Sequence, residues 1–422
     1  MKYWFTTCLF VIFANSYGQN INGNWYGIVN TNDGAARIVI TVYTEKGNDK
    51  SYLTSPEFLG SKIIFFDSIR RAKGKIFLSI KNELKVFADI INDTLITGVF
   101  SSSHPLVYRK ISLVKVRSYP DLSKPQTPKP PFPYNTKRIS FKDSSTGLSY
   151  KGALTIPITS RNEPTLFPAI ILLPGTGSHH MDYQAGGHKF FAILADHLTR
   201  NGYIVLRKNS RFYGDTAHHF ENITLPETVA DAEAAFRFLK KQDNVDTTRI
   251  GILGHSEGGL VAAALAAKTS EVNFIVLMAS PGISFKKIVF EQRKHLLKGV
   301  KNSFMLNFFR ETSPDSLIAI TPRTKFLFEY DPALPLSKLT IPVLALNGDK
   351  DLRVNAAENI FAIDSILKAS GNTKYQTMIL PGINHNFQKC VKCTIKEGVF
   401  LEETISTEVL NLITEWLKNT KQ

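Results

Sequence analysis

A proline-rich run divides this chain of 422 residues into two parts. Residues 119–134, YPDLSKPQTPKPPFPY, contain six prolines. Proline fixes the backbone angle φ and carries no amide hydrogen, so neither a helix interior nor a central strand accepts such a run. We interpret residues 119–134 as a semi-rigid, extended linker between two domains, and the chain is long enough to contain two.

The first eighteen residues have the pattern of a signal peptide. Lys2 gives a short positive start, Trp4 to Ala14 form an apolar stretch, and Ser16-Tyr17-Gly18 supplies small residues at a cleavage site before Gln19. The apolar stretch is shorter than the ~20 residues that a membrane-spanning helix needs. The pattern predicts export to the periplasm or the extracellular space, without stable membrane insertion.

Residues 19–118 predict a small antiparallel β-domain, a sandwich or a barrel. Short β-branched or aromatic runs alternate with turn residues such as Gly47-Asn48-Asp49 and Asn92-Asp93. No catalytic constellation occurs among them. The expected strands are Thr41–Tyr43, Lys62–Phe66, Lys75–Ile80, Leu84–Ile90 and Leu95–Phe100.

From residue 135 to 422 strands and helices alternate. The strands are short and wholly apolar, as in Ala169–Leu173 and Phe274–Met278, which is typical of a parallel sheet covered on both faces. We therefore expect a doubly wound, mostly parallel α/β domain, with a short helical cap at about 283–328, where the alternation breaks. Expected helices include Phe190–Arg200, Glu227–Lys241, Gly258–Lys268, Glu358–Ala369 and Thr407–Lys418.

Charge and histidine content exclude some classes of function. The formal net charge is +15, but the lysines are scattered, so the sequence gives no reason to expect nucleic-acid binding. The neighbouring pairs His179-His180 and His218-His219 point apart on an extended chain and are poor metal clamps. We expect neither a metal nor an organic cofactor; the sequence leaves the oligomeric state open.

The hexapeptide Gly254-His255-Ser256-Glu257-Gly258-Gly259 is the most informative motif. It fits G-x-S-x-G and stands between an expected strand and an expected helix, the context in which this motif makes a nucleophile elbow. A tight turn there lifts the Ser256 hydroxyl clear of the sheet, and the helix that follows directs its positive end at developing negative charge. Ser256 is the predicted nucleophile.

The partners of Ser256 follow from their order along the chain, in which an acid and then a histidine come after the serine. His385 follows an extended run and is the predicted general base; His295 precedes every plausible acid. Asp349 and Asp351 both follow the strand that ends at Leu346. We favour Asp351 as the acid that orients the imidazole and interpret Asp349 as a turn residue.

Two backbone amides should form the oxyanion hole. One is that of Glu257, which comes directly after the nucleophile. The other should come from Pro174-Gly175-Thr176-Gly177, the loop after an expected strand. We favour Thr176 over its neighbour Gly177.

These residues resemble the α/β-hydrolase superfamily, and more closely the exported bacterial esterases grouped with the serine aminopeptidase-like and dienelactone-hydrolase-like families. The segments that carry the resemblance include Gly254 to Gly259, Leu346 to Asp351 and Asn384 to Gln388. The resemblance implies the same triad and no cofactor. One loop departs from the family pattern: an Asp-Arg-Gly-x-Gly motif is replaced by Asn209-Ser210-Arg211-Phe212-Tyr213-Gly214.

The leading functional hypothesis is a serine hydrolase that cleaves small-molecule carboxylic esters through an acyl-enzyme. A serine peptidase with the same triad is a second hypothesis, and a non-catalytic binding protein is a third. Cys390 and Cys393, the two cysteines beyond the signal peptide, could form a disulfide or remain free.

Overall fold

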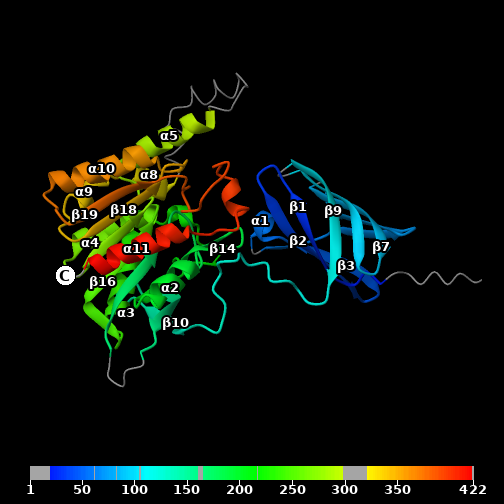
Figure 1. The fold of residues 1–422 in the computed structure, drawn as a ribbon, viewed down its shortest axis with the longest axis horizontal. Helices are drawn as coiled ribbons and strands as arrows, with labels where there is room; N and C mark the ends of the chain where they lie inside the picture. The colour runs from blue at the N-terminus through cyan, green and yellow to red at the C-terminus, as the bar shows by residue number, and fades with distance from the viewer. Residues whose placement is uncertain are drawn as a thin grey trace, which may run out of the picture. The chain divides into compact units, whose positions relative to one another are not determined.

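The computed structural model describes residues 20–60, 62–81, 83–103, 106–159, 165–215, 217–297 and 321–420. The chain divides into two compact units, unit 1 up to Leu122 and unit 2 from Ser123 onward (Figure 1). The predicted signal peptide and the cap residues 298–320 lie outside the described residues. Within the described ranges no helix has the length and apolar character needed to cross a membrane.

Unit 1 is a single antiparallel sheet of nine strands that curls into a half-barrel, in the order β4-β3-β2-β1-β9-β8-β7-β6-β5 (Figure 1). Buried residues alternate along β1, where Trp25 and Val29 are fully buried. The prediction of an antiparallel β-domain is thus confirmed. The elements are β1 Gly23–Asn30, β2 Ala35–Glu45, β3 Asn48–Thr54, α1 Pro56–Leu59, β4 Ile63–Phe65, β5 Ser68–Ala72, β6 Lys75–Ile80, β7 Leu84–Asn92, β8 Leu95–Ser103 and β9 Leu106–Val116.

The proline-rich run is shared between the two units, because the boundary falls at Leu122 and Ser123. Gln126 binds the far end of unit 2: its side-chain oxygen accepts from the amides of Thr404 and Ile405, and its NH₂ group donates to the Ile405 carbonyl at 2.8 Å. Lys124 is fully buried. The later part of this run, from Ser123 onward, therefore packs on unit 2.

Unit 2 contains an eight-stranded sheet in the order β10-β11-β15-β12-β16-β17-β18-β19. β10 and β11 join antiparallel at one edge, and the strands from β15 to β19 run parallel. The predicted α/β-hydrolase fold, doubly wound and mostly parallel, is confirmed. The strands are β10 Tyr134–Lys142, β11 Ser149–Pro157, β12 Phe167–Leu173, β15 Ile204–Lys208, β16 Val245–His255, β17 Phe274–Met278, β18 Val343–Gly348 and β19 Tyr375–Leu380, with a separate hairpin of β13 Gln184–Ala185 and β14 His188–Lys189.

Helices cover both faces of this sheet, which explains why its central strands are apolar throughout. α2 and α11 pack on one face through residues such as Leu194 and Ile413. α3, α4 and α10 cover the other, through residues such as Phe236, Leu265 and Ile363. The helices are α2 Phe190–Arg200, η1 Phe220–Asn222, α3 Leu225–Lys240, α4 Glu257–Lys268, α5 Phe285–Leu297, α8 Pro322–Glu329, α9 Ala333–Leu336, α10 Ala356–Ala369, η2 Glu397–Val399 and α11 Thr407–Asn419.

Candidate active site

Ser256 occupies a strained turn between β16 and α4. Its φ is 53° and its ψ −123°, a conformation that side-chain-bearing residues rarely adopt. Neighbouring backbone segments pack so closely in this turn that a side chain on either glycine would clash. A Cβ on Gly254 would lie 2.2 Å from the Gly258 carbonyl oxygen, and one on Gly258 would lie 2.3 Å from the Leu173 carbonyl oxygen. The glycines of the motif thus have a steric reason, and the serine stands at the carboxyl end of a central strand.

Asp351 and His385 meet across the ends of β18 and β19. The His385 Nδ1 atom lies 2.7 Å from one Asp351 carboxylate oxygen. The other oxygen accepts the backbone N–H groups of Arg353 and Val354 at 2.7 and 2.9 Å. The Asp351 side chain is fully buried. This fixed carboxylate holds the proton of His385 on Nδ1 and leaves Nε2 as the basic nitrogen.

Asp349, the alternative acid, has a different environment only two residues away. It is exposed, and its carboxylate accepts the Gly382 N–H at 2.7 Å and pairs with Lys350 at 2.9 Å. The hydrogen bond from Lys350 lowers the pKa of Asp349 below its usual value. Asp349 therefore ties two loops together at the surface, while Asp351 contacts the histidine.

The loop that carries His385 is fixed by its own amide side chains. The Asn384 side-chain oxygen accepts the N–H groups of Asn386 and Gln388 at 3.0 and 3.1 Å. Gln388, almost fully buried, donates to the carbonyls of Gly398 and Glu403. The amide-rich sequence around the histidine thus satisfies backbone groups that the irregular loop leaves open.

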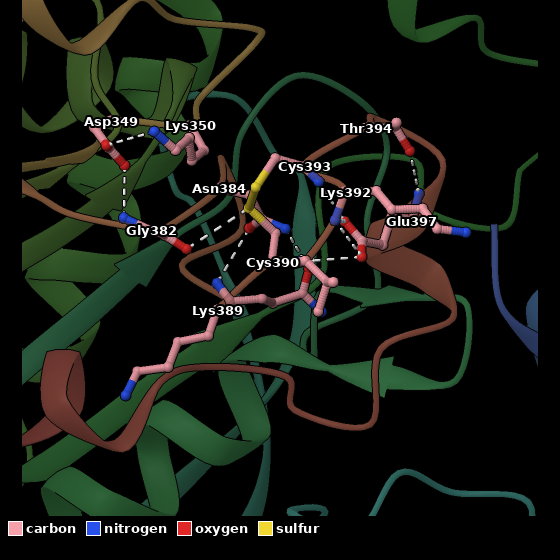
Figure 2. Close-up of a disulfide and its surroundings, with 12 residues drawn as sticks. Asp349, Lys350, Gly382, Asn384, Lys389, Cys390, Lys392, Cys393, Thr394 and Glu397 are labelled. Carbon is pink, nitrogen blue, oxygen red and sulfur yellow. Dashed lines mark hydrogen bonds and ion pairs between the residues drawn. A yellow bond between two sulfur atoms is a disulfide. The ribbon is translucent and has the colours of Figure 1, made fainter.

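A disulfide closes the next part of this loop (Figure 2). Cys390 and Cys393 are joined, with their Cα atoms 4.9 Å apart. The buried Glu397 carboxylate accepts the backbone N–H groups of Val391, Lys392 and Cys393. The sequence left the pairing of these cysteines open; the structure pairs them five and eight positions after the candidate base.

The two expected oxyanion-hole residues lie on either side of the elbow. Glu257 is the first residue of α4, so its backbone N–H belongs to the set that a helix leaves unsatisfied. Thr176 lies in the loop after β12, and its hydroxyl donates to the Glu257 carboxylate at 2.8 Å. Thr176, Ser256, Glu257 and His385 all line the same cavity.

The Glu257 side chain also pairs with Arg323 of the cap helix α8, which sequence reasoning missed. Both side chains are buried, and the Arg323 guanidinium also donates to the Ile223 carbonyl and stacks over the Phe220 ring, 4.1 Å from its centroid. One carboxylate therefore connects the elbow, the Thr176 loop and the cap. Because the partners are 66 positions apart in sequence, no local pattern predicted the pair.

A second missed feature is a hydrogen-bonded clamp behind the base. His255 Nε2 lies 2.9 Å from the His385 carbonyl oxygen, so this nitrogen carries the hydrogen. The other ring nitrogen of His255 then accepts from the Tyr183 hydroxyl at 3.2 Å, and that hydroxyl also receives the Gly175 backbone N–H. Burial, with a smaller effect of His385, lowers the pKa of His255 to about 3. The clamp is thus neutral at physiological pH.

The candidate site opens into a cavity of about 330 Å³ with two chemically different sides. One side is apolar and lies against α5, α8 and the start of α4 and α10: Leu260, Pro281, Phe285, Ile288, Leu327 and Val354. The other side is more polar and comes from the hairpin β13–β14 and the loop after His385: Gln184, His188, Asn386, Gln388 and Thr404. The volume suits a small organic molecule.

Among the described side chains, no group of three or more His, Cys, Asp or Glu is arranged to hold an ion. His179 binds the Thr176 carbonyl through Nε2 at 2.9 Å and packs edge-on against Tyr183. His218 pairs with Asp215 and stacks on Phe212. Within the described chain these histidines have local structural partners.

Two sequence comparisons match parts of this chain. Residues 232–390 match the family described as BAAT / Acyl-CoA thioester hydrolase C terminal, and this segment contains Ser256, Asp351 and His385. Esterase EstD of Thermotoga maritima is 29% identical over 244 residues, which are 56% of this chain and 57% of the relative. The chain thus spans little more than half the length of that relative.

Solved structures with a similar fold include two esterases. The Pyrococcus furiosus esterase Pf2001 is 16% identical, with a TM-score of 0.48, and covers 72% of this chain and 100% of its own. Est1E from Butyrivibrio proteoclasticus is 19% identical, with a TM-score of 0.43, over 67% of this chain and 96% of its own. The strand order of unit 2, with its parallel central strands and helices on both faces, is that of the α/β-hydrolase fold.

Proposed function

We propose that this protein is a serine esterase that hydrolyses small carboxylic esters through an acyl-enzyme on Ser256. The observation that carries the proposal is the 2.7 Å contact of the buried Asp351 with His385, which lines the same cavity as the strained Ser256. A serine in the same cavity as a histidine that a carboxylate orients is the arrangement used for hydrolysis through a covalent intermediate. The resemblance to Esterase EstD supports the same class.

The first half-reaction forms the acyl-enzyme. The Ser256 hydroxyl oxygen attacks the ester carbonyl carbon while His385 Nε2 takes its proton, and Asp351 stabilises the imidazolium that results. The carbonyl oxygen becomes an oxyanion, and the backbone N–H groups of Glu257 and Thr176 bind it. The C–O bond to the alcohol then breaks, and the proton moves from His385 to the departing alkoxide.

The second half-reaction reverses these roles. Water attacks the acyl carbon, His385 removes a proton from that water, and the tetrahedral intermediate collapses. The acid leaves, and Ser256 regains its proton from His385. The Glu257–Arg323 pair supports this chemistry indirectly, because it fixes both the first turn of α4 and, through Thr176, the loop that supplies the second donor.

The peptidase alternative receives less support. An aminopeptidase needs a carboxylate in its pocket to hold the free amine of its substrate. Among the described residues that line the cavity, Glu257 supplies the single carboxylate, and Arg323 already neutralises it. The cavity thus offers an amine no free anionic partner from the described part of the chain.

We further propose that the protein is exported, because residues 1–18 have the pattern of a signal peptide and Cys390–Cys393 is a disulfide of the kind that persists in oxidising compartments. Expression in a bacterium with fractionation tests this part. Mature protein that begins at Gln19 outside the cytoplasm is the expected result; intact, cytoplasmic protein contradicts it.

Hydrolysis of 4-nitrophenyl esters of two to eight acyl carbons, measured beside an aminoacyl 4-nitroanilide panel, tests the proposed activity. We expect turnover of the esters, abolished in Ser256→Ala, with anilide hydrolysis at least a hundredfold slower. Faster hydrolysis of the anilides would favour the peptidase. No turnover of any ester by the native protein would refute the esterase.

A further inference from the structure

A small polar recess adjoins the candidate active site on the side of the base. It has a volume of about 30 Å³ and shares His385, Asn386 and Arg353 with the main cavity. Lys350, Asn384 and Thr394 add further polar groups to its wall. A cavity that holds one water needs about 10–15 Å³ of such volume, so this recess accepts a group of two or three polar atoms, the size of a carboxylate.

Two positively charged side chains, Lys350 and Arg353, line the recess, and they differ in whether they form an ion pair. Lys350 is paired with Asp349 at 2.9 Å (Figure 2). Arg353 is exposed, and its guanidinium forms no ion pair or hydrogen bond with any residue that the structure describes. The two acids nearest in sequence are already engaged, Asp349 with Lys350 and Asp351 with His385. Arg353 is thus a cation at the wall of both cavities whose donors remain available.

Two further carboxylates lie on the other side of Arg353. Glu291 and Glu358 border a separate shallow recess toward α5 and α10, which Arg353 also lines. No ion pair joins either of them to Arg353 within the described chain. They do not line the recess beside His385. Arg353 therefore borders the recess beside His385 and this acidic recess alike, and it forms an ion pair with neither carboxylate.

The position of the recess tells which part of an ester it meets. In the proposed mechanism His385 delivers a proton to the departing alcohol, so the alcohol must leave on the side of His385. The recess lies at that side, whereas the apolar wall formed by Phe285, Ile288 and Leu327 lies under the cap. An apolar acyl group fits the second, and an anionic alcohol fits the first.

From this arrangement we infer that Arg353 is a specificity-determining residue that selects esters with a carboxylate on the leaving alcohol. This inference rests on the proposed esterase function and adds the substrate class. Arginine presents planar, always-charged donors that match a carboxylate. Because the contact is equal in the bound ester and in the transition state, Arg353 should lower KM rather than raise kcat.

The test compares 4-acetoxybenzoate, whose leaving phenol bears a carboxylate, with its methyl ester, in which a methyl group removes that charge; release of acetate from the phenol is measured for both. The measured quantity is the ratio of kcat/KM for the anionic ester to that for the neutral ester. An exposed charged contact contributes about 1 kcal/mol, so Arg353→Gln should lower this ratio roughly fivefold to tenfold, through KM of the anionic ester. Arg353→Lys, which keeps the charge but loses the planar fork, should fall between the two.

Two controls keep the test specific. Lys325→Gln removes one exposed positive charge from α8 at a position that lines none of these cavities and should keep the native ratio. A second pair, mono-4-nitrophenyl adipate and 4-nitrophenyl hexanoate, carries the charge on the acyl side. Its ratio should be the same in the native protein and in Arg353→Gln.

The outcomes separate the inference from the function on which it rests. If native protein hydrolyses neither aromatic ester, the esterase proposal fails. If it hydrolyses both and the ratio is unchanged in Arg353→Gln, the esterase proposal stands and the role of Arg353 is refuted. An equal loss with the acyl-side pair would overturn the assignment of the recess to the leaving alcohol.

Discussion

Units 1 and 2 both contain a sheet with buried apolar strands, but they differ in where buried charged side chains and strained backbone occur. Among the described residues of unit 1, Glu57 is the one buried ionisable side chain, and it pairs with Arg37. The non-glycine residues with positive φ in unit 1 are three exposed lysines in tight turns: Lys46, Lys73 and Lys81.

In unit 2 the same features gather where the parallel strands end. Its non-glycine residues with positive φ include Tyr183 and Ser256, which line the cavity, and Phe387, two positions after His385. Buried charged groups include Glu257, Arg323 and Asp351. Strain and buried charge cost free energy, and a fold retains them where other contacts hold them in place. The strained and charged groups of unit 2 thus gather around the candidate site, whereas those of unit 1 lie in surface turns and in one buried ion pair.

The largest expected effect comes from replacing one serine in each unit with alanine and comparing the ester turnover of the two variants. Ser256→Ala should reduce ester turnover by three or more orders of magnitude, because roughly that much catalysis depends on the nucleophile. The matched change is Ser51→Ala, a buried serine of unit 1 whose hydroxyl has no hydrogen-bond partner among the described residues. Its kcat should remain within about twofold of the native value, since no catalytic contact is lost. Equal losses would break the contrast.

Within unit 2 the same contrast separates two aspartates. Asp351→Asn should lower kcat by about 10²–10⁴, because an amide at this position no longer holds the His385 proton on Nδ1. Asp349→Asn should change kcat by less than about fivefold, since it weakens a surface contact with Lys350. Steady-state kinetics on one ester gives both values. The reverse order would transfer the role of the acid to Asp349.

Truncation sharpens the boundary between the units. A chain of residues 123–422 keeps the Gln126 contacts with Thr404 and Ile405 and should unfold cooperatively. A chain of residues 135–422 loses them, and at about 1 kcal/mol for each hydrogen bond it should be less stable by roughly 2–4 kcal/mol. Urea denaturation of both proteins measures the difference. Equal stability would return the whole proline-rich run to the status of a linker.

Acid should destabilise unit 2 through its buried histidines. Burial lowers the pKa of His255 to about 3 and also lowers the pKa values of His179 and His197. Below about pH 6.5 the unfolded chain takes up protons that the folded chain excludes. Stability therefore falls as the pH drops from 7 toward 4, and His255 alone contributes up to about 1.4 kcal/mol per pH unit.

The variant His255→Gln isolates this effect, because glutamine can still donate to the His385 carbonyl but does not titrate. Its free energy of unfolding, measured in urea between pH 7 and 4, should fall less steeply than that of the native protein. An identical slope would show that His255 makes no contribution to the acid sensitivity.

The disulfide should have the smallest effect on stability. It joins residues only three positions apart, so it removes little chain entropy from the unfolded state. Replacing both cysteines with serine should shift Tm by only a few degrees, roughly what 1 kcal/mol gives in a domain of this size. Activity should fall more noticeably, because Cys393 and Thr394 line the recess beside His385. Unchanged ester hydrolysis in the double variant would remove the catalytic part of this prediction.

The sequence predicted the covering helices and central strands of unit 2, because a strand buried on both faces is apolar throughout and the helix that covers it is amphipathic. Phe190–Arg200 and Phe274–Met278 have the predicted bounds. β10 and β11 were missed: β10 is an edge strand with most of its residues exposed or half-buried, so its sequence lacks the alternation typical of a strand. In unit 1 the turn residues located the hairpins, but no local signal indicated one continuous sheet.

For the candidate site, sequence order was sufficient to choose residues that the fold brings together. It could not predict Arg323 or Tyr183, because both act through long-range contacts, the first with Glu257 and the second with His255. The conformation of Phe212 has a similar lesson. Its φ is 56°, in the left-handed region that favours glycine, and the related motif has glycine at this position.

The central claim is that Ser256 becomes covalently acylated. Intact-mass measurement after treatment with a fluorophosphonate, followed by peptide mapping, tests this claim most directly. We expect one adduct per chain, on the peptide that contains Ser256, with loss of ester hydrolysis in proportion to labelling and no adduct in Ser256→Ala. An adduct on another residue, or full activity in completely labelled protein, would contradict the account.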